Sequence, residues 1–355
     1  LDIASNVTIN GAPGGTTIDA NSIDRVFHVL SGASLTLNNV TITGGAAATG
    51  AGIRVNAGAT LTINGSTVTG NSATGHGGAI YAAGDVTADL VTISGNSAGT
   101  TAGDGGGMYS AGGTHTLTSA TVAFNDADNG GGLAHSAGTL TIGHTILSNN
   151  TATTSGNQCS GTITSANRNV IAATADCDFA PAANDTTGIA AGLVALADNG
   201  GPTETHALNG ASVALDVGGG CSGNDQRGIN RGASCDAGAF EAIQVQFNAA
   251  IASRAEGAGT YTINASLDGS NPYTATTVTV GQTGGTATLG TDYDFTSTPL
   301  SFPSGTTGPL GATVTINEDD FGEGDETAIF GLSGPGGAVL GAFDTHTLTI
   351  TDNEA

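Results

Sequence analysis

The 355-residue chain contains no lysine and no tryptophan, and aromatic residues make up only 4% of it. Because it also contains 59 glycines, any core must be built in thin layers from valine, isoleucine, leucine and alanine. This composition favours an elongated, repetitive protein of two or three domains over one compact domain. No hydrophobic stretch is long enough to form a membrane-spanning helix, so we expect no membrane span.

Positive charge is equally scarce, because six arginines face thirty Asp and Glu residues, which gives a formal net charge of −24. A chain with this charge repels nucleic acid and anionic membranes. The same balance argues against acidic polysaccharides as substrates. It favours bound cations, of which Ca²⁺ is the obvious candidate.

Only four cysteines are present, and they lack the spacing of a zinc site: Cys159, Cys177, Cys221 and Cys235. Of the three possible connectivities, local pairing is the simplest, with disulfides Cys159–Cys177 and Cys221–Cys235. Together with the missing lysine, two disulfides would indicate an oxidising, extracellular environment. The alternative is four unpaired thiols in a reducing compartment.

An internal repeat runs through the first 155 residues. It reads VTITGGAA from Val40, TVTGNSA from Thr67, VTISGNSA from Val91, TVAFNDA from Thr121 and TILSNNTA from Thr145, and the first four copies are followed by GAGI, GGAI, GGGM and GGGL. Equivalent apolar positions are 26, 25, 29 and 24 residues apart, at Ile42, Val68, Ile93, Val122 and Ile146. Such a period is typical of a solenoid.

Threonines alternate with aliphatic residues in LTLNNVTIT and LTINGSTVT, which predicts strands with one face inward. Short strands joined by glycine-rich corners at this period predict a right-handed parallel β-helix, in which each strand pairs with its counterpart one coil away. Corresponding residues then stack in columns. We expect one column of stacked asparagine side chains at a bend: Asn71, Asn96, Asn125 and Asn149.

These repeats resemble, over roughly residues 30 to 155, the GGAI-type repeats of bacterial polymorphic outer-membrane and adhesin β-helices. Further along, NGGPT, Thr205 to Leu208, DQRG at Asp225 and CDAGAFE at Cys235 resemble the choice-of-anchor Q domain of secreted bacterial proteins. That resemblance implies a surface or secreted protein whose β-helix ends in this module. We expect Arg227 to form an ion pair within DQRG that holds the module together.

The composition changes after Glu241, and EDDFGEGDE from Glu318 to Glu326 holds six carboxylates in nine residues. Together with AEG at Ala255, GTDYDF at Gly290, LSFPSG at Leu300, FGLS at Phe330 and LTITDNE at Leu348, this order resembles a Calx-β domain. The resemblance implies an antiparallel sandwich with calcium at one end, held by carboxylates from several loops. The implied ligands are Glu256, Asp292, Asp319, Asp320, Glu323, Glu326 and Asp352, with the carbonyl of Phe321 as a further donor. Asn353 stands where the family has an acid, which would weaken one site.

Catalysis is the main alternative, because parallel β-helices also carry polysaccharide lyases and hydrolases. Hydrolysis needs carboxylates that lie close together, and the acids of the coils are scattered. The pairs that could approach each other in adjacent coils are Asp85 with Asp104 and Asp104 with Asp128. Four histidines form no metal or triad motif and are interpreted as surface or corner residues: His76, His115, His135 and His144. Outward TxT pairs leave a further alternative, ice binding, although outward threonine also suits any solvated strand.

We therefore predict an all-β protein with β-helix coils over residues 1–155, a terminal region with two disulfides over 156–241 and a Calx-β sandwich over 243–355. The predicted function is that of a non-catalytic extracellular structural protein stabilised by Ca²⁺. It would act as a bacterial surface adhesin that binds a cell-surface or glycan receptor, or as a fibre subunit that associates head to tail, because the strand edges of an end coil seek partners.

Overall fold

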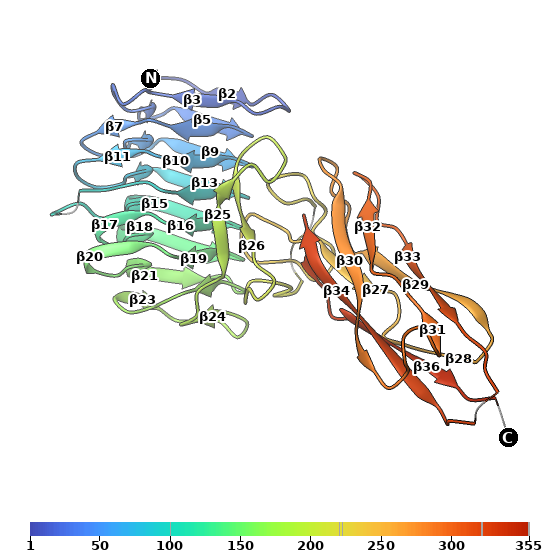
Figure 1. The fold of residues 1–355 in the computed structure, drawn as a ribbon. Coiled ribbons are helices and arrows are strands. Elements are labelled where there is room, and N and C mark those ends of the chain that lie inside the picture. The colour runs from blue at the N-terminus through green and yellow to red at the C-terminus, as the bar shows by residue number, and fades with distance from the viewer. Residues whose placement is uncertain (100, 220, 222, 321, 354–355) are drawn as a thin grey trace. The chain divides into compact units, whose positions relative to one another are not determined.

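The computed structural model describes residues 1–99, 101–219, 221, 223–320 and 322–353. Every regular element among them is a β-strand, so these residues contain no helix that could cross a membrane. The chain divides into two compact units, Leu1–Glu241 and Ala242–Ala355 (Figure 1). The predicted all-β architecture, a parallel β-helix followed by a sandwich, is confirmed.

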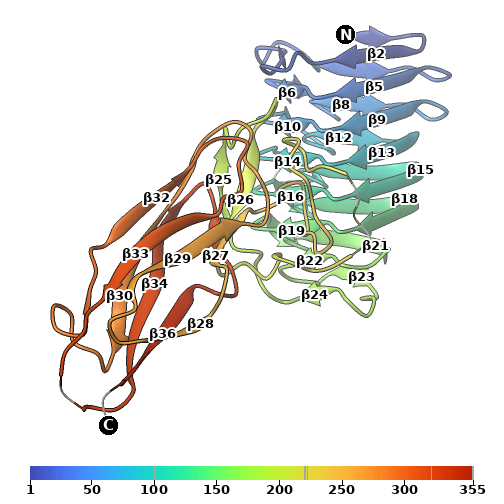
Figure 2. The same cartoon turned by 90° about the vertical axis from the view of Figure 1, so that its right-hand side faces the viewer.

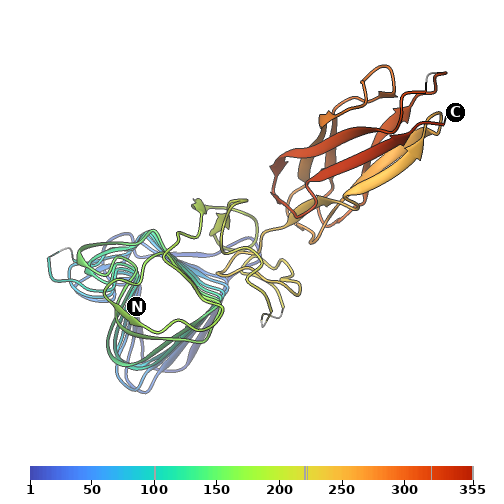
Figure 3. The same ribbon diagram turned by 90° about the horizontal axis from the view of Figure 1, so that it is seen from below.

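The first unit is a solenoid of about six turns whose strands pair in parallel from one turn to the next (Figures 1 and 3). One side of the turns is an eight-stranded sheet: β3 (Thr17–Asp19), β6 (Thr41–Thr43), β10 (Thr67–Thr69), β14 (Thr92–Ser94), β16 (Thr121–Ala123), β19 (Ile146–Ser148), β22 (Val170–Ile171) and β24 (Thr186–Thr187). Short pairs at the corners are β7 (Ala46–Ala47) with β11 (Ser72–Ala73) and β17 (Asp126–Asn129) with β20 (Thr151–Ser155).

The remaining sides form one twelve-stranded sheet, because the long strands β15 and β18 continue around a corner and pair on both sides of it. Its strands are β1 (Asp2–Ile3), β2 (Val7–Asn10), β4 (Phe27–Val29), β5 (Ser34–Asn38), β8 (Ile53–Val55), β9 (Thr60–Asn64), β12 (Ile80–Ala82), β13 (Asp85–Asp89), β15 (Met108–Thr118), β18 (Leu133–Gly143), β21 (Cys159–Ser165) and β23 (Cys177–Phe179). The stacking therefore continues past Ser155, where the repeat fades in the sequence.

Period-two patterning fills the solenoid interior, because alternate residues of each strand turn inward. The aliphatic side chains of β5 and β9 pair directly, Leu35 with Leu61 and Leu37 with Ile63, and all four are fully buried. The same columns continue through β13, β15 and β18. A thin aliphatic core without tryptophan is thus extended from coil to coil.

A buried column of asparagines lines one bend, as the sequence predicts, but its fourth member is Asn150 and not Asn149. Each Nδ2 donates to the Oδ1 one coil further on, from Asn71 to Asn96 at 3.0 Å, from Asn96 to Asn125 at 2.9 Å and from Asn125 to Asn150 at 2.9 Å. These amides also donate to strand carbonyls and accept from backbone N–H groups, so they satisfy the polar backbone of the bend.

Asn149 instead occupies the preceding left-handed position, with a φ of 60°. Earlier coils place Gly70, Gly95 and Phe124 there, also at positive φ. Asparagine tolerates this backbone region better than most residues with a Cβ, and hence two adjacent asparagines fit two different roles. The error of one residue extends to the apolar column, where Val122 pairs with Leu147 and not with Ile146.

The end of the first unit turns back on its own solenoid. Both predicted disulfides are present, and Cys159–Cys177 joins the adjacent strands β21 and β23. After β24 the chain forms the antiparallel pair β25 (Leu193–Ala197) and β26 (Thr205–Leu208) and then irregular structure up to Glu241 (Figure 2). This segment, residues 188–241, lies on the outer face of the eight-stranded sheet and contacts β10, β14, β16 and β19.

The second unit is a sandwich of two five-stranded sheets. In strand order, the first sheet contains β31 (Tyr293–Asp294), β33 (Leu310–Ile316), β29 (Gly259–Leu267), β27 (Gln244–Phe247) and β35 (Val339–Leu340). The second contains β28 (Ile251–Ala255), β36 (Thr345–Thr351), β34 (Glu326–Gly336), β30 (Thr276–Gly285) and β32 (Thr298–Phe302). Buried aromatic residues pack between them, among them Phe302, Phe330 and Tyr293.

Candidate metal centre

Four chain segments meet at one end of the sandwich. They are the turn after β28, the connection from β30 to β31, the acidic loop from β33 to β34, and the residues that follow β36. Backbone hydrogen bonds join them: Gly257 N donates to Asn317 O at 3.0 Å, Asn317 N to Asp292 O at 2.9 Å and Glu256 N to Thr351 O at 3.1 Å. Each of the predicted ligands that the structure describes therefore comes from this end.

Three of the predicted ligands come together within this group. One carboxylate oxygen from each of Asp292, Glu323 and Glu326 lies within 4.8 Å of the other two. Asp292 is only 6% exposed, and its Oδ2 accepts a hydrogen bond from Thr288 N at 2.5 Å, which fixes the side chain. Glu323 is exposed and Glu326 is half-buried, so the cluster has a rigid inner member and an outer face that solvent can reach.

The cluster is electrostatically strained. Loss of solvent around the carboxyl group and its hydrogen bond to Asp292 raise the pKa of Glu326 to about 7, and the negative charges of Asp292, Glu323 and Asp319 act in the same direction. The cluster therefore binds a proton more readily than an isolated carboxylate does. A divalent cation would relieve the same repulsion.

The other predicted ligands lie around the cluster. Asp352 accepts a hydrogen bond from Gly324 N at 2.7 Å, which ties the segment after β36 to the acidic loop. Glu256 is half-buried in the turn after β28. Asp320 is exposed in the acidic loop, and no contact between described residues joins it to the cluster. The predicted carbonyl donor, Phe321, lies outside the described residues.

Two residues at this end were not predicted to act together. Asn353 Nδ2 donates to a carboxylate oxygen of Glu318 at 3.2 Å. The amide thus supplies a donor where a second acid would repel Glu318, and this asparagine is part of a defined contact. In the sequence this contact is visible only as the DNE motif, where Asn353 indicates a weakened calcium site and not a partner for Glu318.

The donor set suits calcium. It consists of several carboxylate oxygens on separate loops, without a nitrogen or sulfur ligand, and hard cations of the calcium type prefer such oxygens. One other group in the described residues has metal-ligand geometry: His144, Cys221 and Cys235. Its two sulfurs are joined in a disulfide, so it is not a metal site.

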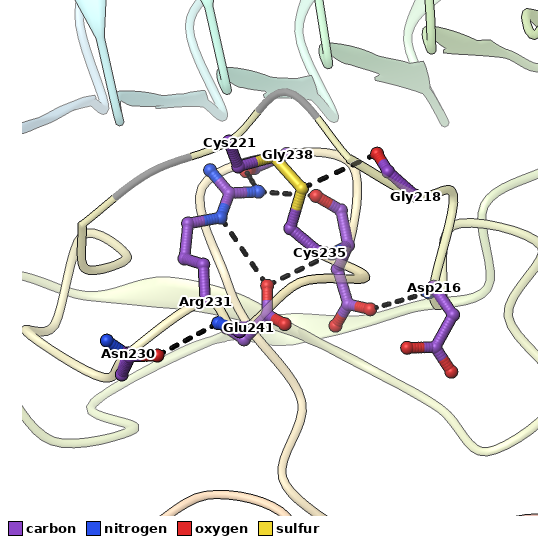
Figure 4. The surroundings of a disulfide bond; sticks show 10 residues. Asp216, Gly218, Cys221, Asn230, Arg231, Cys235, Gly238 and Glu241 are labelled. Atoms are coloured by element: carbon purple, nitrogen blue, oxygen red, sulfur yellow. Dashed lines mark hydrogen bonds and ion pairs between the residues drawn. A yellow bond between two sulfur atoms is a disulfide. The ribbon is translucent and has the colours of Figure 1, made fainter.

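The second disulfide lies beside a buried ion pair (Figure 4). Arg231 Nε lies 3.4 Å from Glu241 Oε2, and burial, assisted by the charge of Asp236, raises the pKa of Glu241 to about 8. The predicted DQRG ion pair is present, with Arg227 Nη2 2.7 Å from Asp225 Oδ2. These contacts, with the hydrogen bond from Arg227 to the Glu241 carbonyl, tie both arginines to the end of the first unit.

The coil acids singled out as catalytic candidates are engaged separately in the described structure. Asp85 accepts from Thr114 N at 2.8 Å, and Asp104 lies 3.5 Å from His76 Nδ1 and accepts from Asn129 at 2.9 Å. Asp128 accepts from a threonine hydroxyl at 3.0 Å. Neither of the two predicted carboxylate pairs is in contact in this arrangement.

The histidines are more varied than predicted. His76 is half-buried and stacks on the Tyr109 ring with centroids 4.4 Å apart, and His135 accepts or donates a hydrogen bond with Ser110 at 3.0 Å. His144 is half-buried beside the second disulfide. His115 corrects the interpretation as a surface residue, because its side chain is fully buried inside the solenoid.

Comparison with known proteins concerns the second unit. The family model of the Calx-beta domain matches residues 240–354. Among solved structures, the apo-form Calx CBD1 domain is 27% identical, with 32% of this chain and 99% of that chain covered and a TM-score of 0.30. The calcium binding domain CBD12 of CALX1.1 is 26% identical, with 31% of this chain and 44% of that chain covered and a TM-score of 0.29. No curated protein matches the chain.

Proposed function

Because the chain carries a Calx-beta domain at residues 240–354, we propose that its second unit binds Ca²⁺ through Asp292, Glu323 and Glu326. The observation that carries the proposal is the convergence of these three carboxylates. The pKa of Glu326, raised by burial and by the hydrogen bond and charge of Asp292, agrees with it. Asp319 and Asp352 stand beside the cluster and would complete the oxygen shell. Binding would join the acidic loop to the connection before β31 and so stabilise this end of the sandwich.

Calcium titration of the whole protein tests this proposal. We expect Ca²⁺ to raise the melting temperature of the second unit, and Asp292→Asn and Glu326→Gln to reduce both the shift and the affinity measured by calorimetry. Asp344→Asn is the matched control, because Asp344 is an exposed carboxylate that precedes β36 at the opposite end of that strand. The absence of a shift at millimolar Ca²⁺, or an equal loss in the control, would contradict the proposed ligand set.

For the whole chain we propose a non-catalytic, extracellular structural protein, acting as a surface adhesin or as a fibre subunit. Two disulfides support an oxidising, extracellular location. The fibre form would use the parallel pairing that joins each turn of the solenoid to the next. A head-to-tail contact of this kind between the coils of two copies would propagate into a filament.

Electron microscopy of the purified protein, with calcium and with chelator, separates the two forms. Filaments would support the fibre subunit, and strictly monomeric particles under both conditions would exclude it. A catalytic role is tested separately by glycan turnover. Turnover that Asp85→Asn or Asp104→Asn abolishes would contradict the structural role, because these residues would then be required for chemistry.

A second candidate function, ice binding, is favoured by one observation. Seven threonines stand in register on the outer face of the twelve-stranded sheet, and none of them is buried: Thr8, Thr36, Thr62, Thr87, Thr116, Thr141 and Thr164. The regular column is longer than the sequence pattern indicates. Thermal hysteresis that Thr62→Tyr abolishes would support this function, whereas no hysteresis in the unmodified protein would exclude it.

A further inference from the structure

A groove of about 510 Å³ opens in the first unit between the eight-stranded sheet and the loop that joins β25 to β26. Its volume lies in the range of small-molecule sites. The floor consists of threonines from the first strands of the sheet, chiefly Thr17, Thr41 and Thr43, and the wall includes Asp198 and Glu204. Both acids are exposed, and no arginine or histidine lines the groove.

The position of the groove follows from the register of the sheet. Thr17, Thr41, Thr67 and Thr92 pair in sequence and form one row of hydroxyls across four coils. A second row, two residues further along each strand, continues from Thr43 to Thr69 and Ser94. Outward hydroxyls at both positions thus repeat from coil to coil along the sheet.

Where segment 188–241 covers these rows, each contacted hydroxyl has a specific polar partner. Thr67 donates to Glu204 O at 2.6 Å, and Thr92 donates to Gln226 Oε1 at 2.7 Å. In the second row, the Ser94 hydroxyl lies 2.8 Å from His206 Nε2. The hydroxyls of both rows therefore bind polar groups of a segment that crosses the strands.

The loop of this segment that joins β25 to β26 approaches the first coil at Gly15 but leaves the hydroxyls of the first rungs without a partner among the described residues. The hydroxyls of Thr17, Thr41 and Thr43 form no hydrogen bond with any other described residue, although they belong to the same rows. The wall of the groove is fixed in place. Thr203 donates to Gly65 O at 3.0 Å, and the backbone of Gly15 approaches so closely that a Cβ there would lie 2.9 Å from Pro202 O.

We propose that this groove binds a neutral saccharide. A sugar ring offers hydroxyls that both donate and accept, and it can donate to Asp198 and Glu204 while it exchanges hydrogen bonds with Thr41 and Thr43. The methyl groups of the same threonines and the Pro202 ring give its C–H faces an apolar contact. Two wall carboxylates, with no cationic residue in the lining, exclude uronates and other acidic glycans.

The experiment is isothermal calorimetry of the full chain with cellotetraose, xylotetraose and mannotetraose, with trigalacturonate as the acidic comparator. We expect at least one neutral probe to bind and trigalacturonate not to bind. Asp198→Asn and Glu204→Gln should each weaken binding about tenfold or more, because each removes a charged hydrogen-bond acceptor. Thr43→Val should weaken it by a smaller factor.

Thr36→Val is the matched control, since it removes an outward hydroxyl from the other sheet and should leave binding unchanged. Unchanged melting temperatures would show that the variants remain folded. The inference is overturned if no neutral probe binds, if trigalacturonate binds more tightly, or if the groove variants bind as well as the unmodified protein. Saccharide binding should persist in chelator, so its failure is distinguishable from failure of the calcium proposal.

Discussion

Replacing His115 by leucine tests whether the solenoid interior tolerates a titratable side chain. His115 lies on β15 in an inward column between Val86 and Leu140, and it is 0% exposed. Neither ring nitrogen has a hydrogen-bond partner among the described residues. Burial lowers the pKa of His115 to about 4, assisted by the neighbouring His135, although the Gly112 backbone and Asp85 act in the opposite direction.

The size and sign of the effect follow from this pKa. Folding lowers the pKa of His115 from the ordinary 6.5 to about 4, so the unfolded chain binds a proton more tightly than the folded chain does. The free energy of unfolding is therefore unaffected above pH 6.5 and decreases progressively as the pH falls to 4. Below pH 4 the loss amounts to about 3 kcal/mol, because each pH unit corresponds to about 1.4 kcal/mol. Leucine matches the neighbouring column residues and cannot be protonated, so His115→Leu should remove this loss.

The measurement is the free energy of unfolding of the first unit at pH 7.5 and at pH 4. It is obtained from hydrogen exchange of peptides that cover β15. The advantage of His115→Leu over the unmodified chain should grow by about 3 kcal/mol between the two pH values. Thr116→Val, which changes an outward residue of the same strand, should show no such growth. An advantage of equal size at both pH values would refute the reasoning.

Three further predictions concern other contacts. Asn125→Leu should destabilise the first unit by about 2 kcal/mol or more in urea unfolding, because it leaves buried donors of the column without a partner, whereas Asn149→Gly should be nearly neutral. Replacing Cys159 and Cys177 by serine should cost about 2–4 kcal/mol in the same assay. In calorimetry without calcium, the second unit should lose stability as the pH rises from 5 to 8, since the folded-state pKa of Glu326 is raised from 4.5 to about 7, and added Ca²⁺ should reverse this trend.

The fold was predictable because a solenoid repeats one local rule. Alternating aliphatic and threonine residues indicate the strands, and the period between copies gives the pairing of each strand with the next coil. The prediction failed by one residue at Asn149, where two adjacent asparagines fit the pattern equally well. Only the backbone resolves this choice, because one position needs a left-handed conformation and the other needs an inward amide.

The candidate metal centre was predicted in outline. Carboxylate density marks the acidic loop, and the structure brings Glu323 and Glu326 to Asp292 from a separate connection. Composition cannot distinguish these residues from Asp320, which lies in the same loop but points to no cluster partner in the described structure. That difference depends on the path of the loop, which local sequence does not determine.

The groove could not be predicted from the sequence, because it too depends on the path of a loop. Its floor follows from the repeat, but its wall comes from residues more than a hundred positions later, which attach through single contacts such as Thr203 to Gly65 O. Such contacts have no period and leave no pattern. The hydroxyl rows were visible in the sequence only as outward threonines, and the alternative of ice binding assigned them to solvent.

The two faces of the solenoid show how one repeated residue type acquires different roles. Outward threonines on the twelve-stranded sheet remain accessible along the whole column, whereas those on the eight-stranded sheet are partly covered by segment 188–241. The reach of that segment, and not the composition of the strands, therefore decides which rungs stay open. Since the loop from 198 to 204 is anchored at Thr67 of β10 and at Gly65, the hydroxyls available beside its carboxylates come from β3, β6 and Thr69. An additional coil inserted between β6 and β10 would move β10, and the loop bound to it, one coil further from β3. The row of uncovered threonine hydroxyls would then gain one member, and the floor of the proposed saccharide site would be one strand longer.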